Sequence, residues 1–212
     1  MQYLQTMLMS AAAVLICLSF HEAAHAFAAY VLGDTTAKDR GRMTLNPVSH
    51  IDPIGFMALL FFHFGWAKPV PINYRNLKKP KLYSAIIALA GPVSNFLLAI
   101  VLYTVAYGMI MFNYNELTYA LAQFLNTTAI ISVGLGVFNL IPIPPLDGSH
   151  ILIPLLPRKQ QLFMIQNAQF IQFALIIGLC FNILNLPLYF LRNIATSGIF
   201  VIVNAILSLL PF

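Results

Sequence analysis

Charged residues are scarce in this chain. Its 212 residues include eleven Lys and Arg and six Asp and Glu, together 8%, whereas 60% are hydrophobic and the mean hydropathy is +0.83. Soluble domains carry about 25% charged residues, so this composition excludes an ordinary soluble domain. The net charge is +5, but the basic residues lie in short loops between apolar runs, with no basic aromatic stripe. We therefore predict a lipid bilayer as surroundings and no nucleic-acid partner.

Cysteine is nearly absent as well. Cys17 and Cys180 both lie inside apolar runs, which excludes a disulfide framework and predicts two small buried hydrophobes. The first residues, Met1 to Thr6, carry no positive charge, so we expect no cleaved signal peptide.

Long apolar runs dominate what remains. Runs of about 20 residues predict membrane helices. They cover about 4–32, 82–111, 117–140, 164–186 and 189–210. We predict an all-α polytopic membrane protein with about five transmembrane helices and a re-entrant or β-like membrane-associated segment near 54–71. Residues 1–212 form one domain, with a motif core over about 1–157 and additional spans over about 160–212.

The distribution of positive charge predicts the orientation. The basic loops 34–53 and 67–81 should face the cytoplasm, because cytoplasmic loops carry the excess of Lys and Arg. The first span then runs inward, and so does the span that precedes Asp147. We expect a multi-pass protein of the cell (inner or plasma) membrane, with its site toward the cytoplasmic side.

The first apolar run contains an unusual polar motif, His21-Glu22-Ala23-Ala24-His25. An acid at the centre of a membrane helix costs about 2.5–3.5 kcal/mol, so ionisable groups there usually mark function. Positions i and i+4 share a helix face, so His21 and His25 can bind one metal ion. Glu22 is turned about 100° away and is placed to act as general base. The motif predicts a catalytic zinc ion, one per chain.

Such a zinc site needs a third protein ligand, and the fourth position stays open for water. Cys17 is excluded, because a helix separates it from His25 by about 12 Å. The candidates are Asp52, His50, His63, Asp147 and His150. Asp147 has the best case because it follows a rigid proline run at the expected depth, with His150 close behind. We expect loop hydrogen bonds for His50 and Asp52, and interfacial anchoring for His63 and Trp66.

Three segments together resemble the site-2 protease family of intramembrane zinc metalloproteases. They are His21-Glu22-x-x-His25, Ala90-Gly-Pro-Val-Ser-Asn95 and Asn139-Leu-Ile-Pro-Ile-Pro-Pro-Leu-Asp147-Gly148. Residues 41–47 and 65–71 also resemble its compact prokaryotic branch. The resemblance covers about residues 15–150 and does not extend to 160–212. It implies that His21, His25 and Asp147 hold zinc, which favours Asp147 over His150.

The predicted activity is hydrolysis of peptide bonds in transmembrane segments of membrane proteins, with Glu22 as general base. Asn95 and Asn139 either form interhelical hydrogen bonds or position the substrate backbone, as the resemblance suggests. The alternatives are a non-catalytic zinc-binding or ion-transporting membrane protein, and a membrane metallohydrolase with a non-transmembrane substrate. The predicted partner is a transmembrane protein substrate, and assembly into a homo-oligomer is left open.

Overall fold

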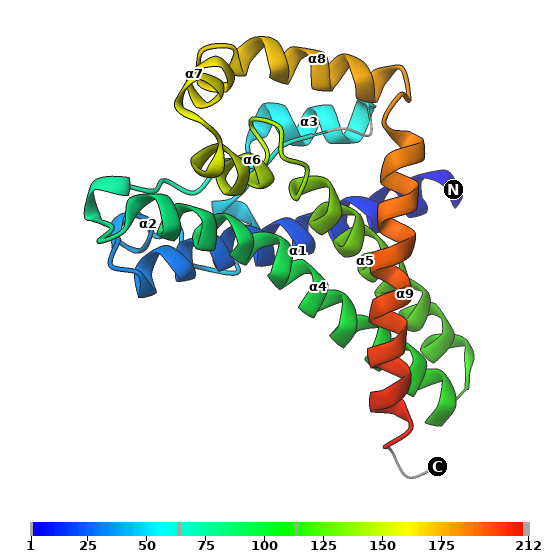
Figure 1. Ribbon diagram of the computed structural model, residues 1–212. Helices are drawn as coiled ribbons and strands as arrows, with labels where there is room; N and C mark the ends of the chain where they lie inside the picture. Colours follow the sequence, from blue (N-terminus) through cyan, green and yellow to red (C-terminus); the bar gives the residue numbers. More distant parts are fainter. Residues whose placement is uncertain (1, 63–64, 113, 210–212) are drawn as a thin grey trace.

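The computed structural model describes residues 2–62, 65–112 and 114–209, and helices make up most of them (Figure 1). The helices are α1 (Gln2–Val31), α2 (Thr36–Asp39), α3 (Pro53–Phe62), α4 (Pro80–Phe112), α5 (Glu116–Asn139), α6 (Asp147–Leu152), α7 (Arg158–Gln166), α8 (Ala168–Cys180) and α9 (Asn185–Leu207). Short 3-10 turns cover Pro47–Ser49, Tyr74–Asn76 and Ile153–Leu155. The described residues contain no strand, although an isolated antiparallel bridge joins Ile51 to Ala67. The predicted all-α fold class is confirmed.

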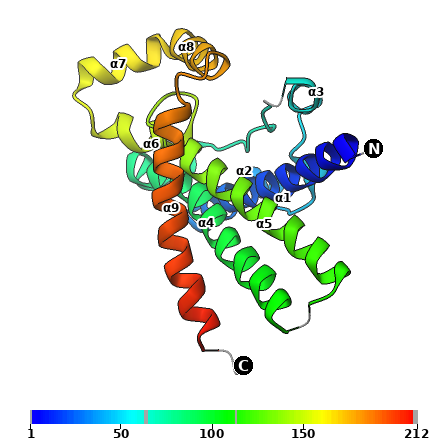
Figure 2. The same ribbon diagram turned by 90° about the vertical axis from the view of Figure 1, so that its right-hand side faces the viewer.

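Three long helices, α1, α4 and α5, pack against one another and form the centre of the molecule (Figures 1 and 2). The α4–α5 turn begins α5 with a capping box, in which Asn115 and Thr118 satisfy each other's backbone N–H groups. Helix α9 packs on α4 and α5, where small residues such as Ala99 and Ala129 are fully buried. Small residues let helix backbones approach closely, which is how membrane helices associate without a hydrophobic driving force.

The four helices α1, α4, α5 and α9 are long and apolar enough to cross a membrane, which matches four of the predicted spans. The run at 164–186 differs from the single continuous helix that we expected. It holds the last residues of α7 and all of α8; the two helices meet at Asn167 with a bend of 67° and make a fifth span only if the pair is counted as one. The Asn167 side chain donates to the Phe163 carbonyl at 2.8 Å, which competes with continuation of the helix.

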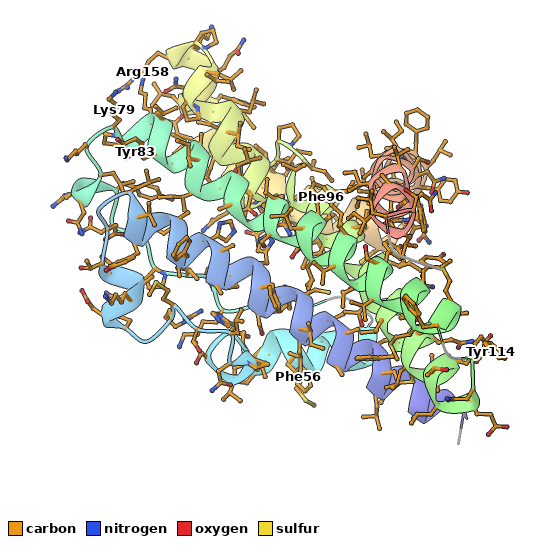
Figure 3. All side chains as sticks on the ribbon, turned by 90° about the horizontal axis from the view of Figure 1, so that it is seen from below. Phe56, Lys79, Tyr83, Phe96, Tyr114 and Arg158 are labelled. Carbon is orange, nitrogen blue, oxygen red and sulfur yellow. The ribbon has the colours of Figure 1, made fainter. Side chains whose placement is uncertain are left out.

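The two ends of the bundle differ in character. Figure 3 shows Lys79 and Arg158 at one end, whereas Tyr114, in the turn after α4, lies at the other. Helices α7 and α8 lie across the first of these ends, near α3 and the beginning of α9 (Figure 1). Lys79, which follows α3 in the chain, and Arg158, which follows α6, therefore share one side of the molecule.

Residues 65–73, called the extended segment below, contain neither helix nor strand, and Ala67 forms the isolated bridge with Ile51. Over residues 54–62 the segment predicted to be re-entrant or β-like is helix α3. Lys68 N–H donates to the His50 carbonyl at 2.9 Å, and the Arg42 guanidinium donates to the Lys68 carbonyl. At the far end, buried Asp34 accepts hydrogen bonds from the Asn73 N–H at 2.7 Å and from the Asn76 amide at 2.8 Å. These bonds hold the extended segment beside the end of α1. His63, an expected interfacial anchor, lies outside the described residues.

Candidate metal centre

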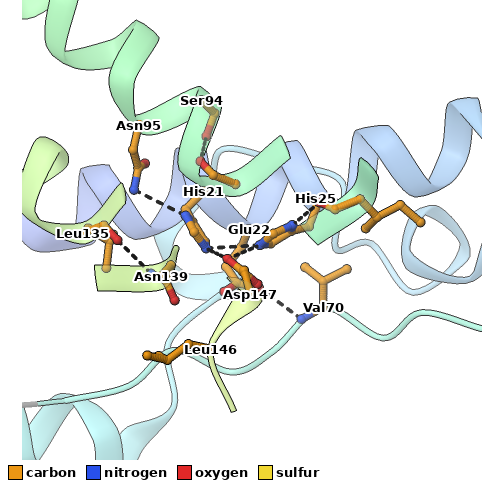
Figure 4. A network of polar contacts seen from close by, with 12 residues as sticks. His21, Glu22, His25, Val70, Ser94, Asn95, Leu135, Asn139, Leu146 and Asp147 are labelled. Carbon is orange, nitrogen blue, oxygen red and sulfur yellow. Dashed lines mark hydrogen bonds and ion pairs between the residues drawn. The ribbon is translucent and has the colours of Figure 1, made fainter. Parts of the chain in front are cut away.

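His21, His25 and Asp147 meet at one point in the interior. The Asp147 Oδ2 atom lies 3.0 Å from His21 Nε2 and 3.3 Å from His25 Nε2, and the two Nε2 atoms are 3.1 Å apart (Figure 4). The side chains come from α1, where one helical turn separates the histidines, and from the start of α6. Both histidines are buried, and these three residues form a cluster with metal-ligating atoms.

The chain after α5 brings Asp147 to the histidines. Helix α5 ends at Asn139, and residues 140–146 form a compact turn that includes a cis peptide bond between Pro144 and Pro145. A Cβ atom on Gly148 would collide with the Leu140 carbonyl oxygen and lie 2.6 Å from that of Ile141. Glycine at this position therefore lets the start of α6 press against the end of α5, which sets the position of its neighbour Asp147.

Helix α4 supports both imidazoles from behind. His25 Nδ1 lies 2.7 Å from the Ile87 carbonyl oxygen and donates its proton there, so that Nε2 keeps a lone pair for a metal ion. One turn further along α4, a Cβ on Gly91 would lie 2.5 Å from His25 Nε2 and 2.6 Å from His21 Cε1. Two turns along, the Asn95 amide nitrogen is 3.3 Å from His21 Nδ1. Ile87, Gly91 and Asn95 therefore form one helix face that receives the two rings.

The donor set fits a zinc ion. Zinc is commonly held at about 2.0–2.1 Å by imidazole nitrogens and carboxylate oxygens, and tetrahedral geometry then separates the ligand atoms by about 3.3 Å. The observed separations of 3.0, 3.1 and 3.3 Å are close to that value. In addition, the Asp147 Oδ2 atom is buried, and although both Nε2 atoms are close to it, it takes part in no aligned hydrogen bond among the described residues. Three such ligands would leave one coordination position open, as in catalytic zinc sites.

The carboxyl group of Asp147 is suited to bind a cation. Burial alone would raise its pKa, but without a metal ion, protons on the facing Nε2 atoms of His21 and His25 outweigh that effect and lower the pKa far below its ordinary value. The group is therefore an ionised carboxylate at neutral pH.

A cavity of about 660 Å³, the site cavity, opens beside the three ligand atoms. Glu22, Asn139, Tyr74 and His150 line it together with residues of the extended segment and of α8. The Glu22 Oε2 atom accepts a hydrogen bond of 3.0 Å from the Val70 N–H (Figure 4). The extended segment thus forms one wall of the site cavity and is fastened directly to the predicted general base.

The residues predicted from the sequence lie in different places around the site. Asn139 is on the cavity wall, with its amide donating to the Leu135 carbonyl at 3.0 Å. Asn95 is fully buried behind His21. His50 Nε2 is 2.8 Å from the Thr44 carbonyl, and Asp52 accepts from the Gly55 N–H at 2.8 Å, so both make loop hydrogen bonds.

Sequence reasoning missed several groups at the site. Tyr74 stacks on His150, the runner-up ligand of the sequence analysis, with ring centroids 6.4 Å apart, and both side chains line the site cavity. No pattern pointed to Tyr74. The Val70 N–H and the Ile87 carbonyl are backbone groups, so the sequence carries no side-chain signal for either of them. Gly91 lies in a quoted motif, but its role depends on how α4 packs on α1.

Comparison with known proteins agrees with this geometry. A family model described as Peptidase family M50 matches residues 107–184, which include Asn139 and Asp147. A relative from Bacillus subtilis (strain 168) that carries the name zinc metalloprotease YwhC is 43% identical over 149 residues, which are 68% of this chain and 67% of the relative. The chain belongs to the M50 family, the site-2 proteases.

Two further members are more distant. A protein named zinc metalloprotease Rip2 from Mycolicibacterium smegmatis (strain ATCC 700084 / mc(2)155) is 32% identical over 180 residues, 78% of this chain and 67% of the relative. A Rip2 from Mycobacterium tuberculosis (strain ATCC 35801 / TMC 107 / Erdman) is 31% identical over 173 residues, 79% of this chain and 65% of the relative. No solved structure matches this chain.

Membership of the family confirms the resemblance drawn from the motifs. The protein is a zinc metalloprotease of the site-2 type, and its apolar helices make it an integral membrane protein. The family implies membrane proteins in a lipid bilayer as substrates.

Proposed function

We propose that this M50 member cleaves peptide bonds within the transmembrane segments of its substrates. His21, His25 and Asp147 hold one zinc ion per chain, and Glu22 is the general base. The single observation that carries this proposal is the convergence of three ligand atoms within 3.3 Å of one another, beside a cavity that Glu22 lines.

The residues divide the work of hydrolysis. A zinc ion held by the three ligands supplies Lewis-acid polarisation of the scissile carbonyl and lowers the pKa of a water molecule toward 7. The Glu22 carboxylate takes the proton of the attacking water and passes it to the departing amine. Asn139, on the wall of the same cavity, binds the substrate backbone next to the scissile bond.

A transmembrane helix hides its peptide groups in internal hydrogen bonds, so the substrate must unwind locally before attack. The extended segment offers a place for the unwound chain, because residues 65–67, 69, 70 and 72 line the site cavity. Ala67 and Ile72 have N–H groups that no described hydrogen bond uses, whereas those of Lys68, Val70 and Asn73 are occupied. We propose that the unwound substrate pairs with this edge as an added strand.

Proline at position 67 tests this pairing, because it removes an N–H that no described bond uses. Ala67→Val changes the side chain and keeps the N–H, and serves as the matched control. We expect Ala67→Pro to lose cleavage of a membrane-helix substrate while it keeps zinc and thermal stability, and Ala67→Val to remain active. Equal cleavage by the two variants would eliminate strand pairing at this edge.

The orientation is also a proposal. Lys79 and Arg158 lie at the end of the bundle that α7 and α8 cross, and the excess of positive charge at that end favours the cytoplasmic side. The site cavity is lined by residues of α8, which lies at the same end. The active site then opens toward the cytoplasm.

The proposed function is tested with purified protein that carries Glu22→Gln, reconstituted in lipid vesicles with a membrane-helix substrate. The amide keeps the shape of Glu22 and can accept the Val70 N–H, but it cannot serve as the base. We expect normal zinc content and loss of cleavage. Unchanged cleavage would refute the assigned base, whereas zinc flux without hydrolysis would favour a transport protein. Hydrolysis of soluble peptides alone would identify a metallohydrolase of another substrate class.

A further inference from the structure

A second cavity of about 310 Å³, the side cavity, adjoins the site cavity. It lies between α1, α5, the beginning of α3 and residues 65–67. The two cavities share part of their walls, namely Leu18, Leu135, Phe138, Leu179 and residues 65–67. A chain lying in the site cavity along the extended segment would therefore pass the side cavity.

The side cavity is lined mainly by aliphatic and aromatic side chains, such as Val14 and Ile131. Two of the polar side chains on its wall are already engaged. Ser19 donates to the Leu15 carbonyl at 2.7 Å, and Asp52 accepts from the Gly55 N–H. A third, His50, has its Nε2 atom 2.8 Å from the Thr44 carbonyl oxygen, and its Nδ1 atom has no partner among the described residues. A charged occupant would find little there to replace its hydration, whereas an apolar one gains by burial.

We propose that the side cavity is a specificity subsite that takes one large apolar side chain of the substrate, such as Leu, Phe or Met. The inference rests on the proposed function and on strand pairing along residues 65–73. Ala67 lies at the shared wall, and Val70 is bonded to the general base. Ala67 and Val70 are three residues apart, and three residues of extended chain span about 10 Å, so the side cavity and the general base are separated by about that distance along the substrate. The side chain that enters the side cavity therefore belongs to a residue two to four positions from the scissile bond.

Filling the cavity tests the proposal. Gly134, on α5, lines the side cavity, and a Cβ atom there would meet no heavy atom within 4 Å, so Gly134→Leu adds bulk from a position where the first side-chain carbon has room. Ile131→Phe fills the same cavity from one turn earlier. The matched control is Gly108→Leu on α4, a helical glycine with the same open surroundings that lines neither cavity. Substrates carry Ala, Leu, Phe or Asp at each position around a cleavage site mapped by mass spectrometry.

We expect the unmodified enzyme to favour Leu or Phe over Ala at one position in that window by about 10-fold to 200-fold in kcat/KM. Gly134→Leu and Ile131→Phe should each reduce this preference at least about 10-fold while Ala substrates are still cleaved, and Gly108→Leu should keep it. Two results would overturn the subsite but leave the proposed protease activity standing. One is cleavage with no side-chain preference at any position in the window, and the other is a preference that Gly134→Leu and Ile131→Phe leave unchanged. A cavity that holds a lipid chain would give the latter result. Cleavage of no substrate overturns the subsite and the proposed function together.

A separate observation concerns Asn95. Its side chain is fully buried on α4, with the amide nitrogen 3.3 Å from His21 Nδ1, and its Oδ1 atom has no hydrogen-bond partner among the described residues. With the amide nitrogen toward Nδ1, the imidazole proton lies on Nε2, and this nitrogen cannot bind a metal. A half-turn of the amide brings Oδ1 to Nδ1, moves the proton to Nδ1 and frees the Nε2 lone pair.

We infer that Asn95 is a positioning residue for His21, as the Ile87 carbonyl is for His25. The half-turn gives the buried Oδ1 atom a partner in place of the amide nitrogen and makes both imidazoles present Nε2 to the same ion. Outer hydrogen bonds of this kind fix the tautomer and the ring orientation of metal-ligating histidines. This role differs from contact with the substrate, because Asn95 does not line the site cavity.

Zinc affinity, measured by competition with a chelator, tests the role without reference to activity. Asn95→Leu removes the acceptor, and we expect affinity to fall about 10-fold to 100-fold. Asn95→Asp keeps an acceptor and should bind zinc at least as tightly as the unmodified protein. Thr104→Val on the same helix removes the Thr104 hydrogen bond to the Ile100 carbonyl, and should change nothing. Normal affinity in Asn95→Leu, or an equal loss in Asn95→Leu and Asn95→Asp, would overturn the inference.

Discussion

A substitution at Gly91 should affect zinc binding and the stability of helix α4 in opposite directions. A Cβ at this position would stand 2.5 Å from His25 Nε2 and 2.6 Å from His21 Cε1. Carbon atoms in contact prefer about 3.5 Å or more, so Gly91→Ala must move both rings by about 1 Å. Metal–ligand distances tolerate about 0.2 Å, so this displacement is several times too large. We expect zinc to bind at least about 100-fold more weakly, equivalent to about 2.8 kcal/mol.

The helix itself should respond in the opposite direction. Replacing a helical glycine by alanine favours the helix by about 0.5–1 kcal/mol. Gly91→Ala should therefore lose zinc and cleavage without loss of helical content, measured by chelator competition and circular dichroism in detergent. Gly108→Ala, with no heavy atom within 4 Å of its Cβ, is the control and should keep its zinc. Zinc affinity within threefold of the unmodified protein in Gly91→Ala would refute the packing of α4 against the two histidines.

Three further results are expected. Gly148→Ala should weaken zinc binding measured by chelator competition, since its Cβ would collide with the Leu140 carbonyl and displace Asp147; normal affinity would contradict this placement. Asp34→Asn should lower the free energy of unfolding by about 1–3 kcal/mol, because buried bonds to Thr36, Asn73 and Asn76 are weakened. Burial raises the Asp34 pKa, but those bonds outweigh it and hold the pKa below 3.8. The stabilisation is thus complete above pH 3.8 and is lost as the pH falls through the lower folded value. Thermal unfolding of the unmodified protein and of Asp34→Asn, measured from neutral to strongly acidic pH, checks this loss. A difference in stability between the two that persists in strong acid would contradict the assignment. Removal of zinc by a chelator should abolish cleavage, and added zinc should restore it; cleavage that survives complete removal would exclude a catalytic metal.

Much of the fold follows from local pattern. The long apolar runs identified α1, α4, α5 and α9, because a chain in lipid must satisfy its backbone groups within each helix. The break at Asn167 escaped detection because a single asparagine does not interrupt a hydropathy pattern. Its effect depends on a side-chain bond to the Phe163 carbonyl and on how α7 and α8 lie across the bundle.

For the site, too, the sequence predicted some residues and not others. Side chains with metal chemistry at helical spacing made His21, Glu22 and His25 visible, and topology brought Asp147 to the same depth. The groups that support the site could not be predicted from the sequence, because they are backbone atoms or a glycine that acts by lacking a side chain. The Ile87 carbonyl, the Val70 N–H and the missing Cβ of Gly91 acquire their roles only when α4 and the extended segment pack against α1.

The zinc coordination sphere is the most direct test of this account. X-ray absorption at the zinc edge of the purified, active protein should show one zinc per chain with two imidazole nitrogens and light oxygen ligands at about 2.0–2.2 Å. Replacing Asp147 by Ala should remove one oxygen neighbour and weaken binding. A sulfur neighbour at about 2.3 Å, or a spectrum that is unchanged when His21 or Asp147 is replaced, would contradict the site.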